Sequence, residues 1–171
     1  EGTAPAALLG AKAVQGDVLV LHGDIVSARR NLEALLTCFR QERPLATALV
    51  QPLGEESPGD WIVAHVAGGQ LRRIEGHPRG GTYRLCGAYA FRRDALAYLR
   101  DNPGLVTHVP VGGMPPLEAE IAQSLQMMLD EGREIPAVET GGYHVDLDKP
   151  WHILEANEHV IDAMSSVLQG D

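Results

Sequence analysis

The chain carries little positive charge. Its 171 residues include 14 Lys and Arg against 23 Asp and Glu, which gives a formal net charge of −9. The basic residues are scattered apart from short pairs such as Arg29-Arg30, Arg72-Arg73 and Arg92-Arg93. Nucleic-acid-binding surfaces need clustered positive charge, so we expect no nucleic-acid partner.

Cysteine and long apolar runs are also scarce. Cys38 and Cys86 have neither the spacing of a metal motif nor the number that a disulfide framework needs, so we expect them to be buried thiols. The longest apolar runs, such as Val18–Leu21, are far shorter than a membrane span, and no charged-then-apolar signal peptide opens the chain. We therefore expect a cytoplasmic protein with no membrane partner.

The hydrophobic content is high enough to form a core. At 44% over residues 1–171, it favours a single globular domain. The chain begins at Glu1 without an initiating Met and runs almost at once into a helix-like stretch. This start predicts a fragment or a processed piece of a longer domain.

The first elements alternate between helix and strand. A helix is predicted over residues 4–14, with Thr3 as its cap. Residues 17–21 form an apolar run, which predicts a strand buried on both faces of a parallel sheet. This strand is followed by His22-Gly23-Asp24, so an acid stands at its carboxyl end.

A second helix and strand complete a βαβ unit. Ser27 is predicted to cap the helix, and residues 46–51 are predicted to form the strand that follows it. The apolar face of this helix consists of Leu32, Leu35, Leu36 and Phe39.

The middle of the chain predicts antiparallel strands. Residues 61–66 and 71–74 are predicted to pair as a hairpin around Ala67-Gly68-Gly69-Gln70. Residues 84–91 are predicted to form a further strand.

Short helices are predicted after Arg93 and after Pro116, and Gly132 is placed to end the second of them. Residues 135–139 and 143–146 predict short strands. A last helix is predicted to start at Pro150, and its apolar stripe predicts core packing by Ile153, Leu154, Asn157, Val160, Ile161, Met164 and Leu168.

Two groups of carboxylates are candidates for chemistry. Ligands of open α/β sheets bind beyond the carboxyl ends of the strands, which makes Asp24 the first candidate. The second is the run His144-Val145-Asp146-Leu147-Asp148, where strand alternation puts the polar side chains on one face. Mg²⁺ takes one or two protein carboxylates and leaves the rest of its shell to water and substrate. Spacing alone is also consistent with a turn at Gly23-Asp24 that has no metal, and with Asp148 as the cap of the last helix.

Short motifs follow one another in a characteristic order. Glu1-Gly2-Thr3-Ala4 is followed, after a short helix, by Gly16-Asp17-Val18-Leu19-Val20-Leu21-His22-Gly23-Asp24, in the pattern G-T-A … D-x-L-V-x-x-G-D. Arg72-Arg73-Ile74-Glu75-Gly76-His77-Pro78 looks like I-x-E-K-P. Cys86-Gly87-Ala88-Tyr89-Ala90-Phe91 is similar to A-G-I-Y-V-F.

The last motif runs from Tyr143-His144-Val145-Asp146-Leu147-Asp148-Lys149-Pro150-Trp151 into Leu154-Glu155-Ala156-Asn157. It resembles W-x-D-I-D-T-P-W-D-L-L-E-A-N. In this order, and over nearly the whole chain, the motifs resemble those of the sugar-1-phosphate nucleotidyltransferases.

The resemblance implies a fold and a reaction. The fold is α/β, Rossmann-like and of the glycosyltransferase-A type, with a mixed, mostly parallel sheet, an antiparallel insertion and its N-terminal part missing. The reaction is attack by a sugar-1-phosphate oxygen on the α-phosphorus of a nucleoside triphosphate, with pyrophosphate leaving. UTP and dTTP are the family's commonest nucleotides, and Mg²⁺ is its metal.

The same resemblance implies roles for particular residues. Gly2 and Thr3 would lie against the nucleobase. The catalytic, metal-holding carboxylates would be Asp24 and Asp146, and the sugar side would be lined by Glu75 and Gly87.

Departures from the family pattern affect the phosphate contacts. The family's Gly-rich phosphate loop, with its Arg and Lys, belongs upstream of Gly2 and is absent from residues 1–171. We therefore expect these residues alone to be inactive. His77 replaces the family's Lys before Pro, and Leu85 replaces the Asn that often precedes the A-G-I-Y strand.

Three hypotheses follow. The first is a nucleotidyltransferase that binds a nucleoside triphosphate and a sugar 1-phosphate. The second is a non-catalytic relative that binds nucleotide sugars and regulates a partner, which the residues His77 and Leu85 favour. The third is a nucleotidyltransferase with a non-sugar acceptor, such as phosphocholine, although Leu154-Glu155-Ala156-Asn157 looks more like the sugar branch. Assembly into a homo-oligomer is left open.

Overall fold

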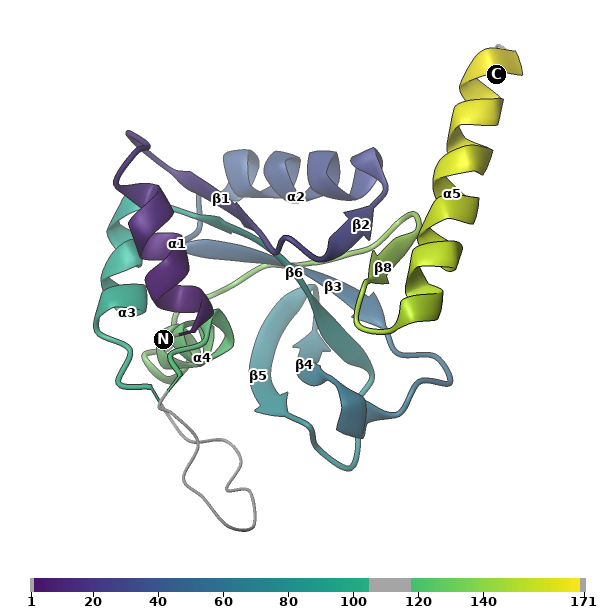
Figure 1. The fold of residues 1–171 in the computed structure, drawn as a ribbon. Coiled ribbons are helices and arrows are strands. Elements are labelled where there is room, and N and C mark those ends of the chain that lie inside the picture. The colour runs from purple at the N-terminus through teal and green to yellow at the C-terminus, as the bar shows by residue number, and fades with distance from the viewer. Residues whose placement is uncertain (1, 105–117, 170–171) are drawn as a thin grey trace.

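A computed structural model of the protein describes residues 2–104 and 118–169 (Figure 1). The helices are α1 (Thr3–Ala11), α2 (Arg29–Glu42), α3 (Leu96–Arg100), α4 (Ile121–Asp130) and α5 (Pro150–Gln169), with short 3-10 turns at Pro58–Asp60 and Arg93–Ala95. The strands are β1 (Val18–Leu21), β2 (Ile25–Ser27), β3 (Ala46–Pro52), β4 (Ile62–Ala67), β5 (Gln70–Gly76), β6 (Tyr83–Phe91), β7 (Ala137–Glu139) and β8 (His144–Asp146).

The main sheet is mixed. Its strand order is β5-β4-β6-β3-β7, and β1 also pairs with β6. β3 pairs in parallel with β7, whereas β6 runs antiparallel to β1, β3 and β4. Because β1 and β3 are both antiparallel to β6, they point the same way, and α2 connects them. The α/β class with a βαβ unit and an antiparallel insertion is thus confirmed.

The two edges of β6 are used differently. One edge pairs along its length with β3, from Ala46↔Phe91 to Pro52↔Tyr83. The other edge is shared, because β4 pairs with Tyr83 and Arg84, whereas β1 pairs with the four residues Ala88 to Phe91. Gly87 lies between the two partners with a φ of 62°, and its carbonyl accepts the N–H of His22 at 2.8 Å. The sheet therefore forks at Gly87.

The first strand is less buried than its apolar sequence predicts. Leu19 and Leu21 of β1 are 39% and 43% exposed, and within the described residues β1 has β6 as its strand partner. The prediction of a strand buried on both faces of a parallel sheet was wrong in this respect.

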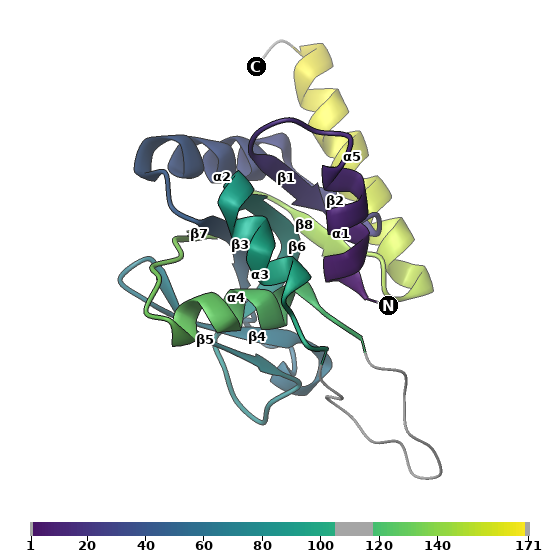
Figure 2. The ribbon, with the colours of Figure 1, turned by 90° about the vertical axis from the view of Figure 1, so that its left-hand side faces the viewer.

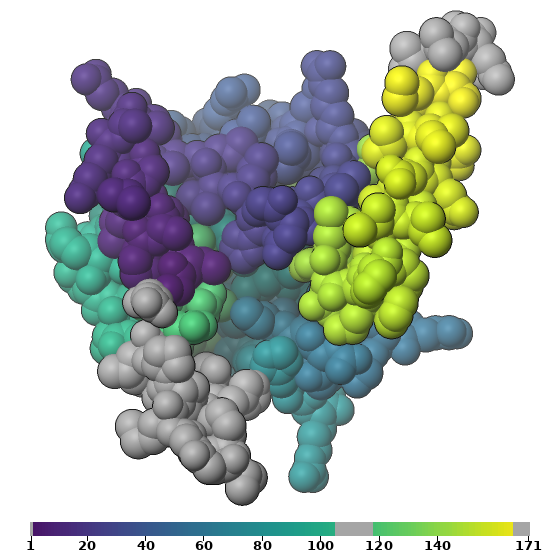
Figure 3. Space-filling model, viewed as in Figure 1, coloured from purple at the N-terminus to yellow at the C-terminus, as the bar shows by residue number. Residues whose placement is uncertain are grey.

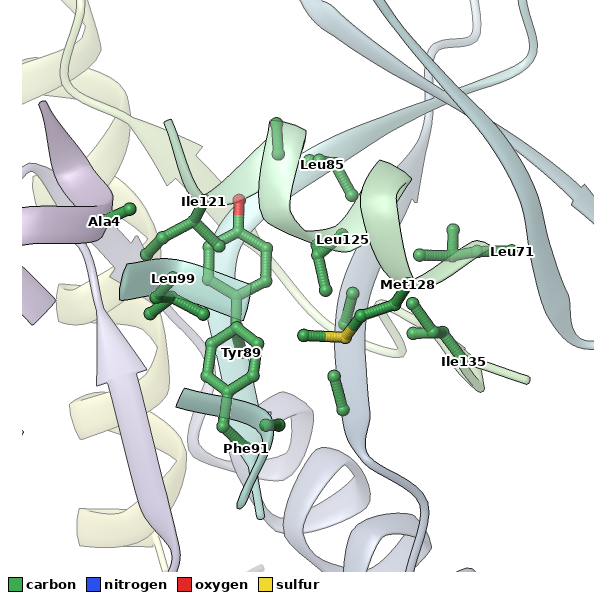
Figure 4. Close-up of a cluster of buried hydrophobic side chains, with 14 of the residues drawn as sticks. Ala4, Leu71, Leu85, Tyr89, Phe91, Leu99, Ile121, Leu125, Met128 and Ile135 are labelled. Atoms are coloured by element: carbon green, nitrogen blue, oxygen red, sulfur yellow. The ribbon is translucent and has the colours of Figure 1, made fainter. Parts of the chain in front are cut away.

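Helices cover both faces of the main sheet. Leu35 and Phe39 of α2 pack on one face, against Leu49, Cys86 and Ala88. On the other face lie α1, α3 and α4 (Figure 2). Figure 4 shows the core beneath α4, made of Leu71, Leu85, Tyr89, Phe91, Leu99, Ile121, Leu125, Met128 and Ile135.

The predicted hairpin is confirmed as β4 and β5. Ala67 pairs with Gln70, and the connecting Gly68 and Gly69 have φ values of 61° and 72°. Positive φ at both central residues is the signature of the type I′ turn, whose twist matches that of a hairpin.

Helix ends differ from the sequence-based expectations in detail. The N-cap of α2 is Ala28, because Ser27 belongs to the three-residue strand β2. The N-cap of α1 is Gly2, and Thr3 is the first helical residue. Gly132, with a φ of 75°, directly follows the C-cap of α4, as predicted. Pro116, the expected start of the helix now seen as α4, lies outside the described residues.

The last helix stands away from the body of the molecule (Figures 1 and 3). Ala156 is buried, and Tyr143 stacks on His159 with ring centroids 5.0 Å apart. Within the predicted core stripe Val160 is partly buried, whereas Ile153, Leu154, Ile161 and Met164 are all more than half exposed. The prediction was wrong because α5 contacts β8 through a different face, and periodicity alone does not say which face is covered.

In the part of the chain that the structure describes, no helix is both long enough and apolar enough to cross a membrane.

Candidate functional site

A short two-stranded sheet brings Asp24 and Asp146 together. β2 and β8 pair antiparallel, with Ile25 opposite Asp146. The N–H of Leu147 donates a hydrogen bond to the backbone oxygen of Asp24 at 2.7 Å. The two candidate carboxylates, which are far apart in the sequence, are therefore neighbours at one end of this β2–β8 ribbon.

The electrostatics of the pair suit a cation. The pKa of Asp146 is raised by its partial burial and then by the negative charge of Asp24, whereas Arg84 acts in the opposite direction. A bound divalent cation would relieve this repulsion. Among the described residues no group of three or more His, Cys, Asp or Glu is arranged to hold a metal. A pair of carboxylates nevertheless fits Mg²⁺, which takes few protein ligands and prefers oxygen.

Asp148, the alternative acid, is placed differently. Its carboxylate is exposed and lies 2.5 Å from the ammonium group of Lys149. α5 starts at Pro150, and the N–H of Lys149 donates to Nδ1 of His152 at 3.1 Å.

Asn31 anchors the β2–β8 ribbon to α2. It is 1% exposed, and its Oδ1 accepts the N–H groups of Gly141 and Gly142 at 2.9 and 3.0 Å. Its Nδ2 donates to the backbone oxygen of Tyr143 at 3.1 Å and to Oγ of Ser27 at 3.0 Å. One buried carboxamide thus holds both the entry to β8 and the end of β2. Sequence analysis missed Asn31 because an isolated Asn in a helix matches no motif.

Gly87 is required by its surroundings. A Cβ atom at this position would lie 2.8 Å from Cγ and Nδ1 of the His22 ring, and φ is 62°. The ring of His22 also packs edge-on to Tyr89, with centroids 5.7 Å apart. The histidine that directly precedes Gly23-Asp24 therefore packs against the point where the sheet forks. Whether Gly87 lines a sugar site stays a prediction.

Gly2 and Thr3 lie at the start of α4. A Cβ at Gly2 would come within 2.6–2.9 Å of the Ala119 backbone. The Thr3 hydroxyl donates to Glu120 at 2.6 Å and accepts the N–H of Ile121 at 2.9 Å. These contacts use the donor and one lone pair, so one acceptor lone pair is left for a ligand. Contact with a nucleobase stays a prediction for both residues.

Glu75 is engaged within the hairpin. Its carboxylate lies 2.7 Å from Nε2 of His65 and also pairs with Arg73. A cavity of about 400 Å³ lies on the side of Ile74 and Gly76, its neighbours in β5. Because side chains alternate along a strand, Glu75 points to the other face.

The motif I-x-E-K-P aligns differently when it is counted back from Pro78, because its Glu then falls on Gly76 rather than on Glu75. The predicted sugar contact of Glu75 is untested, and the structure does not bring it to the Asp24–Asp146 pair.

Of the two residues that depart from the family pattern, His77 lines cavities at the surface and Leu85 lies in the core. His77 lines both the 400 Å³ cavity and a second one of about 470 Å³ beside the start of α5. Its Nδ1 lies 3.0 Å from the backbone oxygen of Gly59. Leu85, by contrast, is 7% exposed and packs in the core beneath α4. The surface is hollowed between the start of α1, the β8–α5 region and the strands below (Figure 3).

Comparisons of sequence find no relatives. No protein-family model matches the chain, and no curated protein is significantly similar to it.

Solved structures, however, share its fold. A Bacillus anthracis protein assigned as a glucose-1-phosphate thymidylyltransferase, in complex with sucrose, is 20% identical with a TM-score of 0.71 over 92% of this chain and 60% of its own. A UDP-glucose pyrophosphorylase with UDP-glucose is 14% identical, with a TM-score of 0.76 over 95% and 63%. The inositol-1-phosphate CTP transferase of T. maritima is 13% identical, with a TM-score of 0.71 over 93% and 62%.

The chain spans about three-fifths of the length of each of these neighbours. Its mixed sheet, forked at β6 and covered by helices on both faces, is the fold of the sugar-1-phosphate nucleotidyltransferases that its motifs resemble.

Proposed function

We propose that the protein containing this chain transfers a nucleotidyl group from a nucleoside triphosphate, UTP or dTTP, to a sugar 1-phosphate. The products are a nucleotide sugar and pyrophosphate. The observation that carries the proposal is the placement of Asp24 and Asp146 side by side by the pairing of β2 with β8. The resemblance of the motifs assigns the metal of the family to these positions, and the fold is the one that these enzymes share.

The chemistry asks little of covalent catalysis. The attacking oxygen of a sugar 1-phosphate is already an anion, so positioning and charge neutralisation carry the rate. Asp24 and Asp146 would hold Mg²⁺, which when bound neutralises phosphate charge and orients the reacting oxygens. The chain itself contributes a half-buried Asp146, a ribbon fixed by Asn31 and a backbone fork at Gly87 that holds His22 beside the carboxylates.

The alternative is a non-catalytic protein that binds nucleotide sugars and regulates a partner. Two observations favour it. His77 stands where the family has a phosphate-binding Lys, and its Nδ1 already lies within hydrogen-bond distance of the Gly59 carbonyl oxygen. Leu85 is buried in the core and offers no polar contact to a sugar.

The deciding experiment measures pyrophosphate release by the gene product that contains this chain, in Mg²⁺, with a panel of nucleoside triphosphates and sugar 1-phosphates. We expect release with one pair. Residues 1–171 by themselves are expected to be inactive. A folded protein that binds nucleotide sugars but releases no pyrophosphate with any pair would establish the regulatory alternative.

The same assay tests the carboxylates. Asp24→Ala and Asp146→Ala should each reduce turnover more than tenfold, a loss of over about 1.4 kcal/mol. Asp148→Ala is the matched control, because Asp148 lies in the same motif but is exposed and paired with Lys149. Retention of more than about a tenth of the activity by either of the first two variants would refute their assignment as metal ligands.

A further inference from the structure

A small polar cavity lies beside Asp146, on the side of the main sheet. Its volume is about 70 Å³, and the start of α5 closes one end of it through His152 and Glu155. The rest of its lining comes from Gln51 of β3, Glu56 and Trp61 of the segment after it, Arg84 of β6, and His144, Val145 and Asp146 of β8.

Arg84 is an unusual residue for such a position. It is 3% exposed, and its guanidinium carbon lies 3.8 Å from the centre of the Trp61 ring. Its Nη2 donates to Oε1 of Gln51 at 2.9 Å, and its Nε lies 3.4 Å from the Glu56 carboxylate. Among the described residues its Nη1 has no hydrogen-bond partner. A buried charge with an unused donor is costly, so this donor requires an acceptor.

His144 presents the same requirement. It is 4% exposed, and within residues 2–104 and 118–169 neither of its ring nitrogens has a hydrogen-bond partner. Alternation along β8 places His144 and Asp146 on the same face, toward the cavity. At roughly 30 Å³ per molecule, a cavity of this size holds about two waters, and polar walls are what buried water needs.

We propose that Arg84 is the positioning residue of Asp146: through water in this cavity, its Nη1 group and the ring of His144 hold the Asp146 carboxylate in the orientation that binds the divalent cation. The inference rests on the proposed function for its metal, but not for the water-mediated interaction between Arg84 and Asp146. It assigns to Arg84 a role that no motif of the sequence indicates.

The sign of one measurement separates this role from simple electrostatics. Arg84 is a cation close to a cation site, so by Coulomb's law alone its removal should strengthen metal binding. If Arg84 orients Asp146, its removal should weaken metal binding despite the loss of a positive charge.

Mn²⁺ binding to the purified protein, followed by the electron paramagnetic resonance signal of free Mn²⁺, provides that measurement. We expect Arg84→Met to weaken binding about tenfold, and Arg84→Lys, which keeps the charge but not the fork of donors, to weaken it less. Arg73→Met removes an exposed arginine and should leave the affinity unchanged. Unchanged or tighter binding by folded Arg84→Met would overturn the proposal.

A second variant distinguishes the positioning role of Arg84 from a purely structural role. Trp61→Leu removes the ring on which the guanidinium stacks, but leaves Nη1 and His144 in place. Its Mn²⁺ affinity should stay within about twofold of the wild type. A loss as large as that of Arg84→Met would show that Arg84 merely ties the loop to the sheet.

A double-mutant cycle tests the interaction between Arg84 and Asp146 without metal or catalysis. The urea midpoint is measured for Arg84→Met, Asp146→Asn and the double variant. We expect Arg84→Met to shift the midpoint less when Asp146→Asn is already present, because the acceptor has been neutralised. Strictly additive shifts would refute the proposed interaction. Since this readout needs no turnover, it stands apart from any failure of the proposed enzyme activity.

Discussion

The side-chain oxygen of Asn31 accepts the backbone N–H of Gly142 at 3.0 Å. Gly142 is 111 residues away in the sequence and lies two positions before the start of β8. The same carboxamide also bonds Ser27 at the end of β2. Asn31 is therefore the point at which helix α2 holds both strands of the carboxylate-bearing ribbon.

Replacement of Asn31 by Leu should both destabilise the protein and loosen the ribbon. The variant removes the acceptor of the Gly141 and Gly142 N–H groups and one of the two donors to the Tyr143 carbonyl, which keeps the N–H of Ala28. Because Gly142 and Tyr143 are only partly buried, we expect a loss of about 1–3 kcal/mol in unfolding free energy. Urea unfolding measures this loss, and Mn²⁺ affinity should fall as well.

Asn102→Leu is the matched control for this prediction. Asn102 also bonds backbone and side-chain groups, those of Glu120, Ser124 and Gly104, but at the start of α4 rather than at the ribbon. It should reduce stability and leave Mn²⁺ affinity unchanged. Equal effects of the two variants on Mn²⁺ would contradict the anchoring role of Asn31.

Gly87→Ala should cost more than its backbone angle alone requires. The alanine would adopt an unfavourable positive φ and would also push its Cβ into the His22 ring. Gly132→Ala isolates the first effect, because Gly132 has a φ of 75° and a Cβ added there would meet nothing within 4 Å. We expect a loss of about 1–2 kcal/mol for Gly132→Ala and a larger one for Gly87→Ala, measured by urea unfolding.

Removal of the His22 ring should reduce the difference between these two glycines. In the His22→Ala background, Gly87→Ala should cost less than it does in the wild type, although the Cβ of residue 22 still lies 3.0 Å from the added Cβ. An unchanged cost would mean that the backbone at the fork, rather than the His22 ring, requires glycine.

His144 predicts a loss of stability in mild acid. Burial, followed by the charge of Arg84, lowers the pKa of His144 from 6.5 to about 4. Between these two pH values the unfolded chain binds a proton that the folded protein excludes. The stabilising contribution is therefore complete above pH 6.5 and is lost as the pH falls toward 4, by about 3 kcal/mol at most.

His144→Phe removes this titration while keeping a ring in the same place. The difference in unfolding free energy between wild type and His144→Phe should shrink or reverse as the pH falls from 7 to 4. The raised pKa of Asp146 works in the opposite direction, but it is common to both proteins. Parallel pH profiles would contradict a neutral, buried His144.

Local sequence signals predicted those parts of the fold that depend on local physics. Gly68-Gly69 between alternating apolar residues predicts a hairpin because few residues adopt two consecutive positive φ values. The apolar face of α2 was equally clear from its spacing. The sequence could not reveal that α5 exposes its apolar stripe, because covering a face is a property of its neighbours.

The candidate site shows the same division. Asp24 and Asp146 could be singled out from motifs, and their adjacency follows from a three-residue pairing that is too short to predict. Ser27 was expected to be a helix cap because β2 is so short that its residues resemble a loop. Three further residues depend on segments that are distant in the sequence, which bury them and supply their surroundings, namely Asn31, Arg84 and His144. Local composition indicates neither burial nor partners of this kind.

The separation of the β2–β8 ribbon from the main sheet has a consequence for the order of events during folding. In the described part of the chain these strands pair with each other alone, and two isolated strands of this length are not stable in water. The main sheet can assemble first, whereas the ribbon gains its register when α2 presents Asn31 to it. Asp24 and Asp146 are thus brought together last during folding and are separated first during unfolding. Amide exchange of Val26 and Val145 should therefore report a local opening free energy well below the global unfolding free energy.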